Sequence, residues 1–464
     1  MYLASTLLLG SLVVVPSAPG WAPCPGDDVP AGLVCASVDV PVDWARPDGR
    51  RITLQIAKLP ATGARTGTVF AVPGGPGGSG VDDLKYRVKS FDNLRGRFDV
   101  VSLTPRTHAS AGGLPVECFT TGPWLTRPDG KADYARLAVA NRASAERCRR
   151  HDPELFDHLD SASFARDIDA VRAALGERRL SFIATSYGGV PAVAYARLFP
   201  ERVRAMYLDG AVNQLRDTRA EMRDRAATYE KQFTRFAAWC AADASCALHG
   251  PDPAARWRKL VARADRDPVP VSGERVRYSG FDMQIAAMPN LVHPGTGNAR
   301  WAQLAAAAAR AEAGDARGFA DYVKASGSLK PPSYTGMNAT HCADGLRFAG
   351  YADYRGALAI GRRLSPNLPD MGVWHRLGCA GWPGRVANPP SPLPSSGLPP
   401  FLGAGTWTDY ADTADLALRV PGSSTVRYDG PGHGLYLTGN ACVIAHADRY
   451  LTDLTLPPPG TVCR

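Results

Sequence analysis

The stretch LSFIATSYGGVPAVAYARLFPERVRAMYLDG, residues 180–210, decides the fold of this chain. Its first part, Leu180 to Thr185, is a short apolar run typical of a strand buried on both faces of a sheet. The chain then enters Ser186-Tyr187-Gly188-Gly189, an apolar helical segment from Val190 to Phe199, and a second buried run from Val203 to Leu208. A strand, a sharp turn, a helix and another strand in direct succession predict an α/β fold with a mostly parallel sheet.

Further strands are expected before this stretch. Residues 34–44 and 50–60 are β-rich runs separated by the turn Arg46-Pro47-Asp48-Gly49, which predicts a hairpin. Thr68 to Val72 and Phe98 to Leu103 are apolar runs typical of buried strands. The segment from Ser163 to Gly176 carries an apolar stripe at helical spacing, and we expect Ser163 to be its N-cap.

The length of 464 residues exceeds that of one ordinary domain, and a hydrophobic content of 45% supplies material for a large core. Ala/Arg-rich helical stretches such as residues 217–242 and 299–325 dominate after the strands, until a Pro-rich stretch at residues 388–400. The α/β pattern then resumes. We therefore predict a leader at residues 1–22, an α/β core formed by residues 23–211 and 396–464, and an inserted helical cap at residues 212–395.

Ser186 is the predicted nucleophile. Where a strand turns abruptly into a helix, a serine hydroxyl is exposed, and the turn requires small residues two positions to either side. Gly188 meets this requirement, and Ala184 departs from the usual G-x-S-x-G motif by one methyl group. A serine at a helix N-terminus is common by itself, but the strand, turn and helix together favour a nucleophile elbow.

A serine needs a general base, and His433 is the predicted one because Gly-Pro-Gly-His-Gly follows a predicted strand, Ser424 to Tyr428. The acid that orients this histidine should lie between the two in the chain. Asp409 is the preferred acid and Asp412 the alternative, since both follow an apolar run in Gly-Thr-Trp-Thr-Asp-Tyr-Ala-Asp. Either aspartate could instead be an ordinary turn residue.

The loop Pro73-Gly74-Gly75-Pro76-Gly77-Gly78-Ser79-Gly80 directly follows a predicted strand and exposes backbone N–H groups. We expect the N–H near Gly75 and that of Tyr187 to form an oxyanion hole. Glycine-rich loops also serve as plain turns or phosphate cradles, but here no Lys-Ser/Thr pair follows to support nucleotide binding.

Several features predict an exported protein without a stable membrane span. The apolar run from Leu7 to Val15, followed by small residues, is similar to a signal peptide and too short to cross a bilayer. The ten cysteines include no C-x-x-C pair and no zinc spacing, which favours disulfides over reduced core thiols. The simplest pairing joins neighbours along the chain: Cys24–Cys35, Cys118–Cys148, Cys240–Cys246, Cys342–Cys379 and Cys442–Cys463.

The formal charge of +9 comes mostly from arginines scattered along the chain. A nucleic-acid-binding protein would gather Lys and Arg into a run or stripe, and none is present in the sequence. Nucleic acid is therefore not an expected partner.

Four motifs give the chain a family resemblance: VPGGPGGSG, TSYGG followed by YARLFPERVRAMYLDG, CAGWP, and GPGHG with a cysteine-containing C-terminal region. Together they resemble the secreted tripeptidyl aminopeptidases, relatives of the proline iminopeptidases within the α/β hydrolases. The resemblance covers nearly all of the chain after the leader. It implies an exopeptidase that acts through an acyl-enzyme on peptides with a free N-terminus, with a cap over the site and without a metal or organic cofactor.

The chain departs from the motifs of this family in three places. Thr104-Pro105-Arg106-Thr107 replaces the usual D-P-R-G, and Ala184 replaces a glycine. The usual D-P-x-T-P around the acid matches Asp409 only after a shift of one residue; without it, the acid position falls on Thr408. These changes concern catalytic power and substrate choice more than the fold.

Three functions remain open at this point. A secreted aminopeptidase needs an acidic or carbonyl-rich subsite for the α-ammonium group, to which Asp344 and Asp209 are candidate contributors, although buried aspartates commonly serve structure alone. An esterase or lipase would use the same triad with an apolar acyl pocket. A catalytically impaired peptide-binding homologue would keep the fold without turnover.

Overall fold

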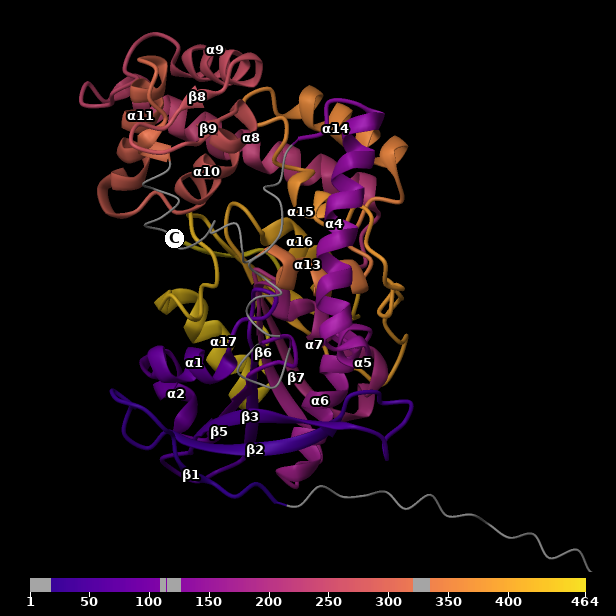
Figure 1. The fold of residues 1–464 in the computed structure, drawn as a ribbon. Helices are drawn as coiled ribbons and strands as arrows, with labels where there is room; N and C mark the ends of the chain where they lie inside the picture. The colour runs from indigo at the N-terminus through magenta and orange to yellow at the C-terminus, as the bar shows by residue number, and fades with distance from the viewer. Residues whose placement is uncertain (1–17, 109–113, 115–126, 320–333) are drawn as a thin grey trace, which may run out of the picture.

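The computed structural model describes residues 18–108, 114, 127–319 and 334–464 (Figure 1). Its core is a ten-stranded sheet in the order β1-β2-β3-β5-β4-β6-β7-β10-β11-β12. The pairings between β1 and β2, β2 and β3, and β3 and β5 are antiparallel, and the rest are parallel. The strands are β1 (Ala22–Pro23), β2 (Val34–Pro41), β3 (Arg51–Leu59), β4 (Gly67–Val72), β5 (Phe98–Leu103), β6 (Leu180–Thr185), β7 (Val203–Asp209), β10 (Leu402–Gly405), β11 (Ser424–Tyr428) and β12 (Thr461–Cys463).

The strand order and parallel pairing confirm the predicted α/β-hydrolase fold. The predicted hairpin is present as β2 and β3, with Ala36 opposite Ile56. β6, which precedes Ser186, lies between β4 and β7 in the middle of the sheet and is buried along its whole length. A strand buried on both faces needs apolar side chains in both directions, which explains the continuous apolar runs of the sequence.

Helices cover both faces of the sheet. One apolar cluster packs α6 and α7 against the sheet, and another packs α1, α2 and α17 against the opposite face. These helices are α1 (Gly80–Tyr86), α2 (Asp92–Arg95), α5 (Pro153–Phe156), α6 (Ser161–Ala174), α7 (Gly189–Leu198), α16 (Tyr410–Ala417) and α17 (Ala441–Asp453). The expected N-cap Ser163 is wrong: the N-cap is Asp160, three residues earlier, whose carboxylate accepts hydrogen bonds from the N–H groups of Ala162 and Ser163.

A second, mainly helical layer, called the cap below, lies above the carboxyl ends of the parallel strands (Figure 1). It has its own apolar cluster, centred on aromatic residues such as Trp257 and Phe233. Its elements are α8 (Thr218–Ala242), α9 (Pro253–Arg266), β8 (Val269–Pro270), β9 (Arg277–Tyr278), α10 (Gly280–Val292), α11 (Ala299–Glu312), α13 (Tyr334–Ala343), α14 (Tyr351–Leu364) and α15 (Trp374–Leu377). α11 ends at Glu312, because the chain turns at Gly314 with a φ of 101°, and residues 320–325 at the end of the expected helical stretch lie outside the described residues.

The helix α4 (Lys131–His151) joins the two layers, which the sequence-based boundaries did not anticipate. Tyr134 and Leu137 in its first turns belong to the apolar cluster of the cap, whereas Ala145 and Cys148 belong to that of the core. In Figure 1 it runs along the side of both layers. Residues before position 212 therefore contribute to the cap, and the proposed boundaries at 211 and 395 remain predictions.

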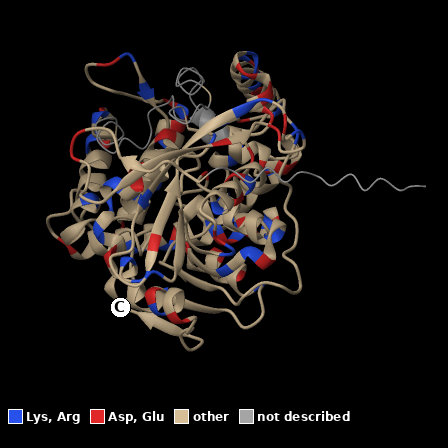
Figure 2. Ribbon diagram, turned by 90° about the horizontal axis from the view of Figure 1, so that it is seen from below, with Lys and Arg blue, Asp and Glu red and all other residues tan. Residues whose placement is uncertain are grey.

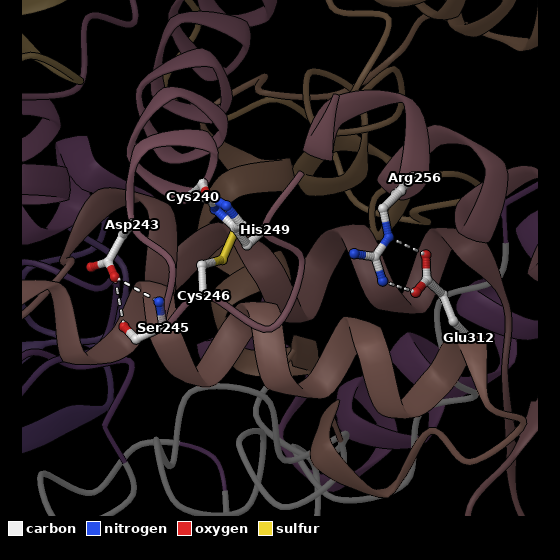
Figure 3. The surroundings of a disulfide bond; sticks show 7 residues. All are labelled: Cys240, Asp243, Ser245, Cys246, His249, Arg256 and Glu312. Atoms are coloured by element: carbon white, nitrogen blue, oxygen red, sulfur yellow. Dashed lines mark hydrogen bonds and ion pairs between the residues drawn. A yellow bond between two sulfur atoms is a disulfide. The ribbon is translucent and has the colours of Figure 1, made fainter. Parts of the chain in front are cut away.

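Four of the predicted disulfides are present: Cys24–Cys35, Cys240–Cys246, Cys342–Cys379 and Cys442–Cys463. Figure 3 shows Cys240–Cys246 closing the turn after α8, beside the hydrogen bonds from Ser245 to Asp243. The fifth predicted pair, Cys118–Cys148, includes Cys118, which lies outside the described residues. Each bond restricts the unfolded chain, which raises stability by about 2–4 kcal/mol in typical cases.

Acidic and basic residues are interspersed over the ribbon rather than gathered by sign (Figure 2). Within the described ranges, no helix combines the length and the apolar character needed to cross a membrane. The predicted leader falls largely on residues that the structure does not describe; its last residue, Ala22, pairs with Cys35 in the sheet.

A fully buried ion pair connects the first hairpin to α6. Arg106 donates two hydrogen bonds to Asp167, at 2.6 and 2.7 Å, and a third to the carbonyl oxygen of Val42. The Trp44 indole N–H also donates to Asp167, at 3.0 Å. Burial raises the pKa of Asp167, against the opposing effect of Arg106. The pair is costly to bury, but its hydrogen bonds are satisfied by groups from three segments of the chain.

We expect Asp167→Asn to lower the free energy of unfolding by about 3–5 kcal/mol, because it leaves the Arg106 guanidinium charge buried without its partner. Urea unfolding monitored by circular dichroism measures this effect. Asp133→Asn is the control, since Asp133 pairs with the exposed Arg136 and should change stability little. Equal effects of the two substitutions would contradict a structural role for the buried pair.

Candidate functional site

The candidate nucleophile Ser186 lies directly after β6, at the edge where the parallel strands end. Its φ of 58° is unusual for a residue with a side chain, and such conformations cost roughly 1–3 kcal/mol. Close packing around Gly188 and Gly189 holds this turn. A Cβ on Gly188 would lie 2.5 Å from the carbonyl oxygen of Val72, and one on Gly189 would lie 2.7 Å from the Cβ of Ala211. Only glycine fits these two positions without a shift of the backbone.

Ala184, the departure from the usual elbow motif, lies two residues before Ser186 within β6. It is fully buried and pairs with Val72 of β4 on one side and Leu208 of β7 on the other. Its methyl group belongs to the main apolar cluster of the core. The sheet therefore accommodates the extra carbon inside the strand, and the turn at Ser186 forms with alanine at this position.

His433 and Asp409 form a hydrogen-bonded pair. The distance between His433 Nδ1 and Asp409 Oδ2 is 2.6 Å. The other carboxylate oxygen of Asp409 accepts hydrogen bonds from the N–H and the hydroxyl group of Thr406, at 2.6 and 3.0 Å. Because Nδ1 faces the carboxylate, the Nε2 atom of His433 is left for a second partner.

Gly210 makes room for this pair. Its φ is 57°, and a Cβ there would lie 2.7 Å from Asp409 Oδ2 and 3.0 Å from His433 Nδ1. A side chain at this position would therefore push the acid and the histidine apart. The glycine follows β7 in MYLDG, so its local sequence alone did not indicate this contact with residues some 200 positions away.

Two contacts bring the His433 loop to the elbow. Asp209 at the end of β7 is fully buried, and its carboxylate accepts hydrogen bonds from the N–H groups of Leu435 and Tyr436, at 2.9 and 2.8 Å. A Cβ on Gly434 would lie 3.2 Å from Thr185 Cγ2, so the residue after His433 packs against the residue before Ser186. Ser186 and His433 line the same cavity.

The alternative acid, Asp412, has a different partner. It lies in α16 with its carboxylate 2.6 Å from the Arg216 guanidinium. Thr408, the residue that the unshifted family alignment puts at the acid position, forms hydrogen bonds with Thr406 and with the carbonyl oxygen of Gly432. The structure therefore brings Asp409, and neither of these residues, to His433.

Charges around His433 favour its protonated form. Burial lowers the pKa of His433, but the hydrogen bond and the charge of Asp409, together with the charge of Asp209, outweigh burial, and the pKa lies above its ordinary value. Burial also raises the pKa of Asp209 to about 6, against the two amide hydrogen bonds that it accepts. A base with a raised pKa becomes neutral at a higher pH than free imidazole does.

A cavity of about 580 Å³ lies between the sheet edge and the cap. Ser186, Asp409 and His433 line it from the core, and residues of α8, α10, α11, α13 and α15 line it from the cap. Gly75 and Tyr187, the predicted oxyanion-hole residues, are also on its wall. The charged cap residues that face it are Glu221, Asp224, Arg225, Arg300 and Arg376.

Asp344 is not on the wall of this cavity, which corrects the expectation that it contributes to a substrate-amine subsite. It is fully buried behind the elbow, where it accepts hydrogen bonds from the N–H and hydroxyl of Ser161, the Tyr187 phenol and the Asn388 amide, at 2.6–3.0 Å. Burial, with the charge of Asp160, raises the pKa of Asp344 to about 7. Asp209 is likewise absent from the wall and holds the His433 loop instead.

The network around Asp344 joins four separate segments. The Gln214 side chain donates to the carbonyl oxygens of Asp344 and Asn388, at 2.5 and 2.6 Å. Gln214 and Asn388 lie near the two ends of the predicted cap, and Asp344 follows α13 within it. This cluster therefore attaches the cap to Tyr187, the residue after Ser186. The sequence analysis named Asp344 only as a candidate ligand of the substrate amine and did not indicate this role as an anchor.

The departures at Thr104 and Thr107 lie beside the glycine-rich loop. The Thr104 hydroxyl is 3.1 Å from the Ser79 hydroxyl, and its N–H donates to the carbonyl oxygen of Gln55. Thr107 Oγ1 would lie 3.6 Å from a Cβ on Gly77. The two threonines thus contact the loop that carries Gly75 without introducing a charge.

Two family models match the chain: the α/β hydrolase fold over residues 67–252 and the TAP-like protein family over residues 367–463. Serine protease Hip1 of Mycobacterium tuberculosis is 30% identical, with 96% of this chain and 90% of the relative covered. Tripeptidyl aminopeptidase of Streptomyces coelicolor is 28% identical, with coverages of 95% and 86%. Carboxylesterase B of Mycobacterium tuberculosis is 31% identical, with coverages of 92% and 86%.

We predict that kcat/KM falls as the pH is lowered through the pKa of His433, with a midpoint above 6.5, because only the neutral imidazole accepts a proton. The measurement should use an ester reporter that lacks an amine, so that the substrate does not titrate. Asp409→Asn should lower kcat by roughly 10³–10⁴-fold and move the midpoint down. Asp412→Asn is the matched control. If Asp412→Asn has these effects and Asp409→Asn does not, the acid is wrongly assigned.

A second prediction concerns the anchor at Asp344. Tyr187→Phe should lower the free energy of unfolding by about 1–3 kcal/mol, because it removes one hydrogen bond to a buried carboxyl group. Asp344→Ala should cost more than this, since the donors of Ser161, Tyr187 and Asn388 then lose their acceptor together. Urea unfolding of the two variants provides the comparison. A smaller loss for Asp344→Ala than for Tyr187→Phe would contradict the network.

Proposed function

Because this chain belongs to the α/β-hydrolase family that includes serine protease Hip1 and the TAP-like proteins, we propose that it is a secreted serine exopeptidase releasing short peptides, most simply tripeptides, from free N-termini. The observation that carries the proposal is the 2.6 Å pair of His433 and Asp409 on the wall of the cavity that Ser186 also lines. The four disulfides support an oxidising, extracellular location.

In the proposed reaction, His433 Nε2 takes the proton of Ser186 as its Oγ attacks the scissile carbonyl carbon. The N–H groups of Gly75 and Tyr187 stabilise the negative charge that develops on the carbonyl oxygen. The C–N bond breaks as His433 gives its proton to the leaving amine, and water then hydrolyses the acyl-enzyme. Asp409 keeps the imidazole in the required tautomer and stabilises its protonated form.

An exopeptidase must also bind the α-ammonium group of its substrate. The carboxylates on the cavity wall, apart from Asp409, are Glu221, Asp224 and Asp412. Glu221 forms ion pairs with Arg225 and Arg376. Asp224 and Asp412 both form ion pairs with Arg216, and the charge of Arg225 also acts on Asp412. Asp224 and Asp412 have one ion-paired guanidinium between them, whereas Glu221 has two, so this Asp224–Asp412 pair is the better site for an ammonium group.

Esterase activity is the second candidate. Met288, Pro289, Val292 and Leu346 give the cavity apolar wall area that suits an acyl chain, and one relative carries the name Carboxylesterase B. An ester needs the same triad but no ammonium subsite. A catalytically impaired peptide binder, the third candidate, would have the cavity without turnover.

The test combines covalent labelling with two matched substrates. A fluorophosphonate probe should label Ser186, and free tripeptide p-nitroanilides should be cleaved in preference to their N-acetylated forms. Ser186→Ala should abolish labelling and should lower turnover by several orders of magnitude, with an unchanged circular dichroism spectrum.

Other outcomes separate the candidates. Labelling with cleavage of simple esters alone would overturn the exopeptidase proposal in favour of an esterase. Binding of peptides by folded protein that the probe does not label would favour the impaired homologue.

A further inference from the structure

Two parts of the cavity wall, called its two ends below, contact different parts of the catalytic machinery. The Tyr187 ring lies 4.6 Å from the His341 ring, and His341 lies 6.1 Å from His375, measured between ring centroids. These histidines belong to α13 and α15 and line the cavity. This end therefore adjoins the proposed oxyanion hole.

The other end adjoins the general base. The Gly432 N–H, one residue before His433, donates a hydrogen bond of 3.1 Å to the carbonyl oxygen of Val292 in α10. His293 follows directly, and its pKa is lowered by burial and by the nearby charges of His433 and Arg300. In Figure 1, α10 and α11 lie on one side of the cap, and α13 and α15 lie on the other.

The proton transfers of the proposed triad assign the two ends of the cavity to different parts of the substrate. The base gives its proton to the nitrogen of the departing amine, so the leaving group lies beside His433. The corner formed by His293 and the start of α11 therefore flanks the part of a peptide that departs, and the Tyr187 end flanks the acyl part.

Arg300 is distinct among the arginines on the cavity wall. Arg225 and Arg376 both pair with Glu221. Arg300 lies in the first turn of α11 and is exposed, and among the residues that the structure describes its guanidinium has no hydrogen bond or ion pair. The first turn of α11 contains no acidic residue that could neutralise it. It thus offers planar, paired N–H donors to a ligand that enters the cavity.

We infer that Arg300 is a specificity-determining residue that binds a carboxylate on the leaving side of the substrate. That carboxylate is either the free C-terminus of a short peptide or an Asp or Glu side chain at the first position after the scissile bond. The inference rests on the proposed exopeptidase function. The preferred substrates are then short oligopeptides whose leaving segment carries a free C-terminal carboxylate or an acidic side chain.

The test uses four tetrapeptides that share the N-terminal sequence Ala-Ala-Ala and end in Ala, Ala-amide, Asp-amide or Asn-amide. Wild-type protein should cleave the free-acid peptide and the Asp-amide peptide about fivefold faster, in kcat/KM, than their neutral partners, as a solvent-exposed ion pair allows. The preference should shrink in 1 M salt, where exposed charges are screened. A preference in only one of the two comparisons identifies which carboxylate is bound.

Arg300→Gln should remove the preference while cleavage of the Ala-amide peptide persists. Arg300→Glu should reverse it, so that a fifth peptide, ending in Lys-amide, is cleaved faster than the Asp-amide peptide. Arg310→Gln, on the same helix but paired with Asp315 outside the cavity, is the control and should keep the wild-type preference.

The outcomes for the two proposals are distinct. Cleavage of all peptides by wild-type protein without any charge preference, or a preference that survives Arg300→Gln, overturns the inference and leaves the exopeptidase proposal intact. Failure of wild-type protein to cleave any of the peptides, with esters cleaved normally, overturns the exopeptidase proposal itself.

Discussion

The turn between β6 and α7 is the constraint on which the rest of the site depends. Ser186 has a backbone conformation that is unfavourable for a residue with a side chain, and it persists because the chain on either side is packed too closely to relax. Gly188 lies against the backbone of Val72, and Gly189 lies against Ala211. The helix that begins at Gly189 and the neighbouring strands therefore hold the serine at the edge of the sheet, facing the cavity.

Three buried aspartates attach loops to this frame. Asp167 binds Arg106, Asp209 binds the amides after His433, and Asp344 binds the phenol of Tyr187. A buried carboxylate without partners would be very costly, so each position requires several donors from segments distant in the chain. Each aspartate therefore joins segments that are distant in the chain. The same need for several donors explains why Asp209 and Asp344 are adjacent to the site without lining the cavity.

The cap supplies most of the charged side chains on the cavity wall, while the core supplies Ser186, His433 and the aspartates Asp409 and Asp412. Glu221 is surrounded by Arg225 and Arg376, Asp224 and Asp412 share Arg216, and Arg300 has no acidic partner among the described residues. Asp412 belongs to α16 of the core, whereas Glu221, Asp224, Arg225, Arg300 and Arg376 belong to helices of the cap, so charges of both signs face the cavity from several elements. Such an arrangement suits a substrate with charged groups at defined distances from the bond that is cleaved.

Local sequence determined the strands, the elbow and the choice of the histidine. Continuous apolar runs such as Leu180 to Thr185 can only be buried on both faces, and the glycines after Ser186 allow one sharp turn, so short-range patterns were sufficient to predict β4 to β7 and the fold. Neighbouring cysteines likewise predicted four disulfides that are present.

Only the tertiary structure decided which acid faces His433, that Gly210 makes room for the pair, that α4 belongs to both layers, and that Asp344 is an anchor. The physical reason is that these properties depend on contacts between residues far apart in the chain. Asp409 and Asp412 have similar local sequences, and they differ because the fold puts one beside an imidazole and the other beside a guanidinium.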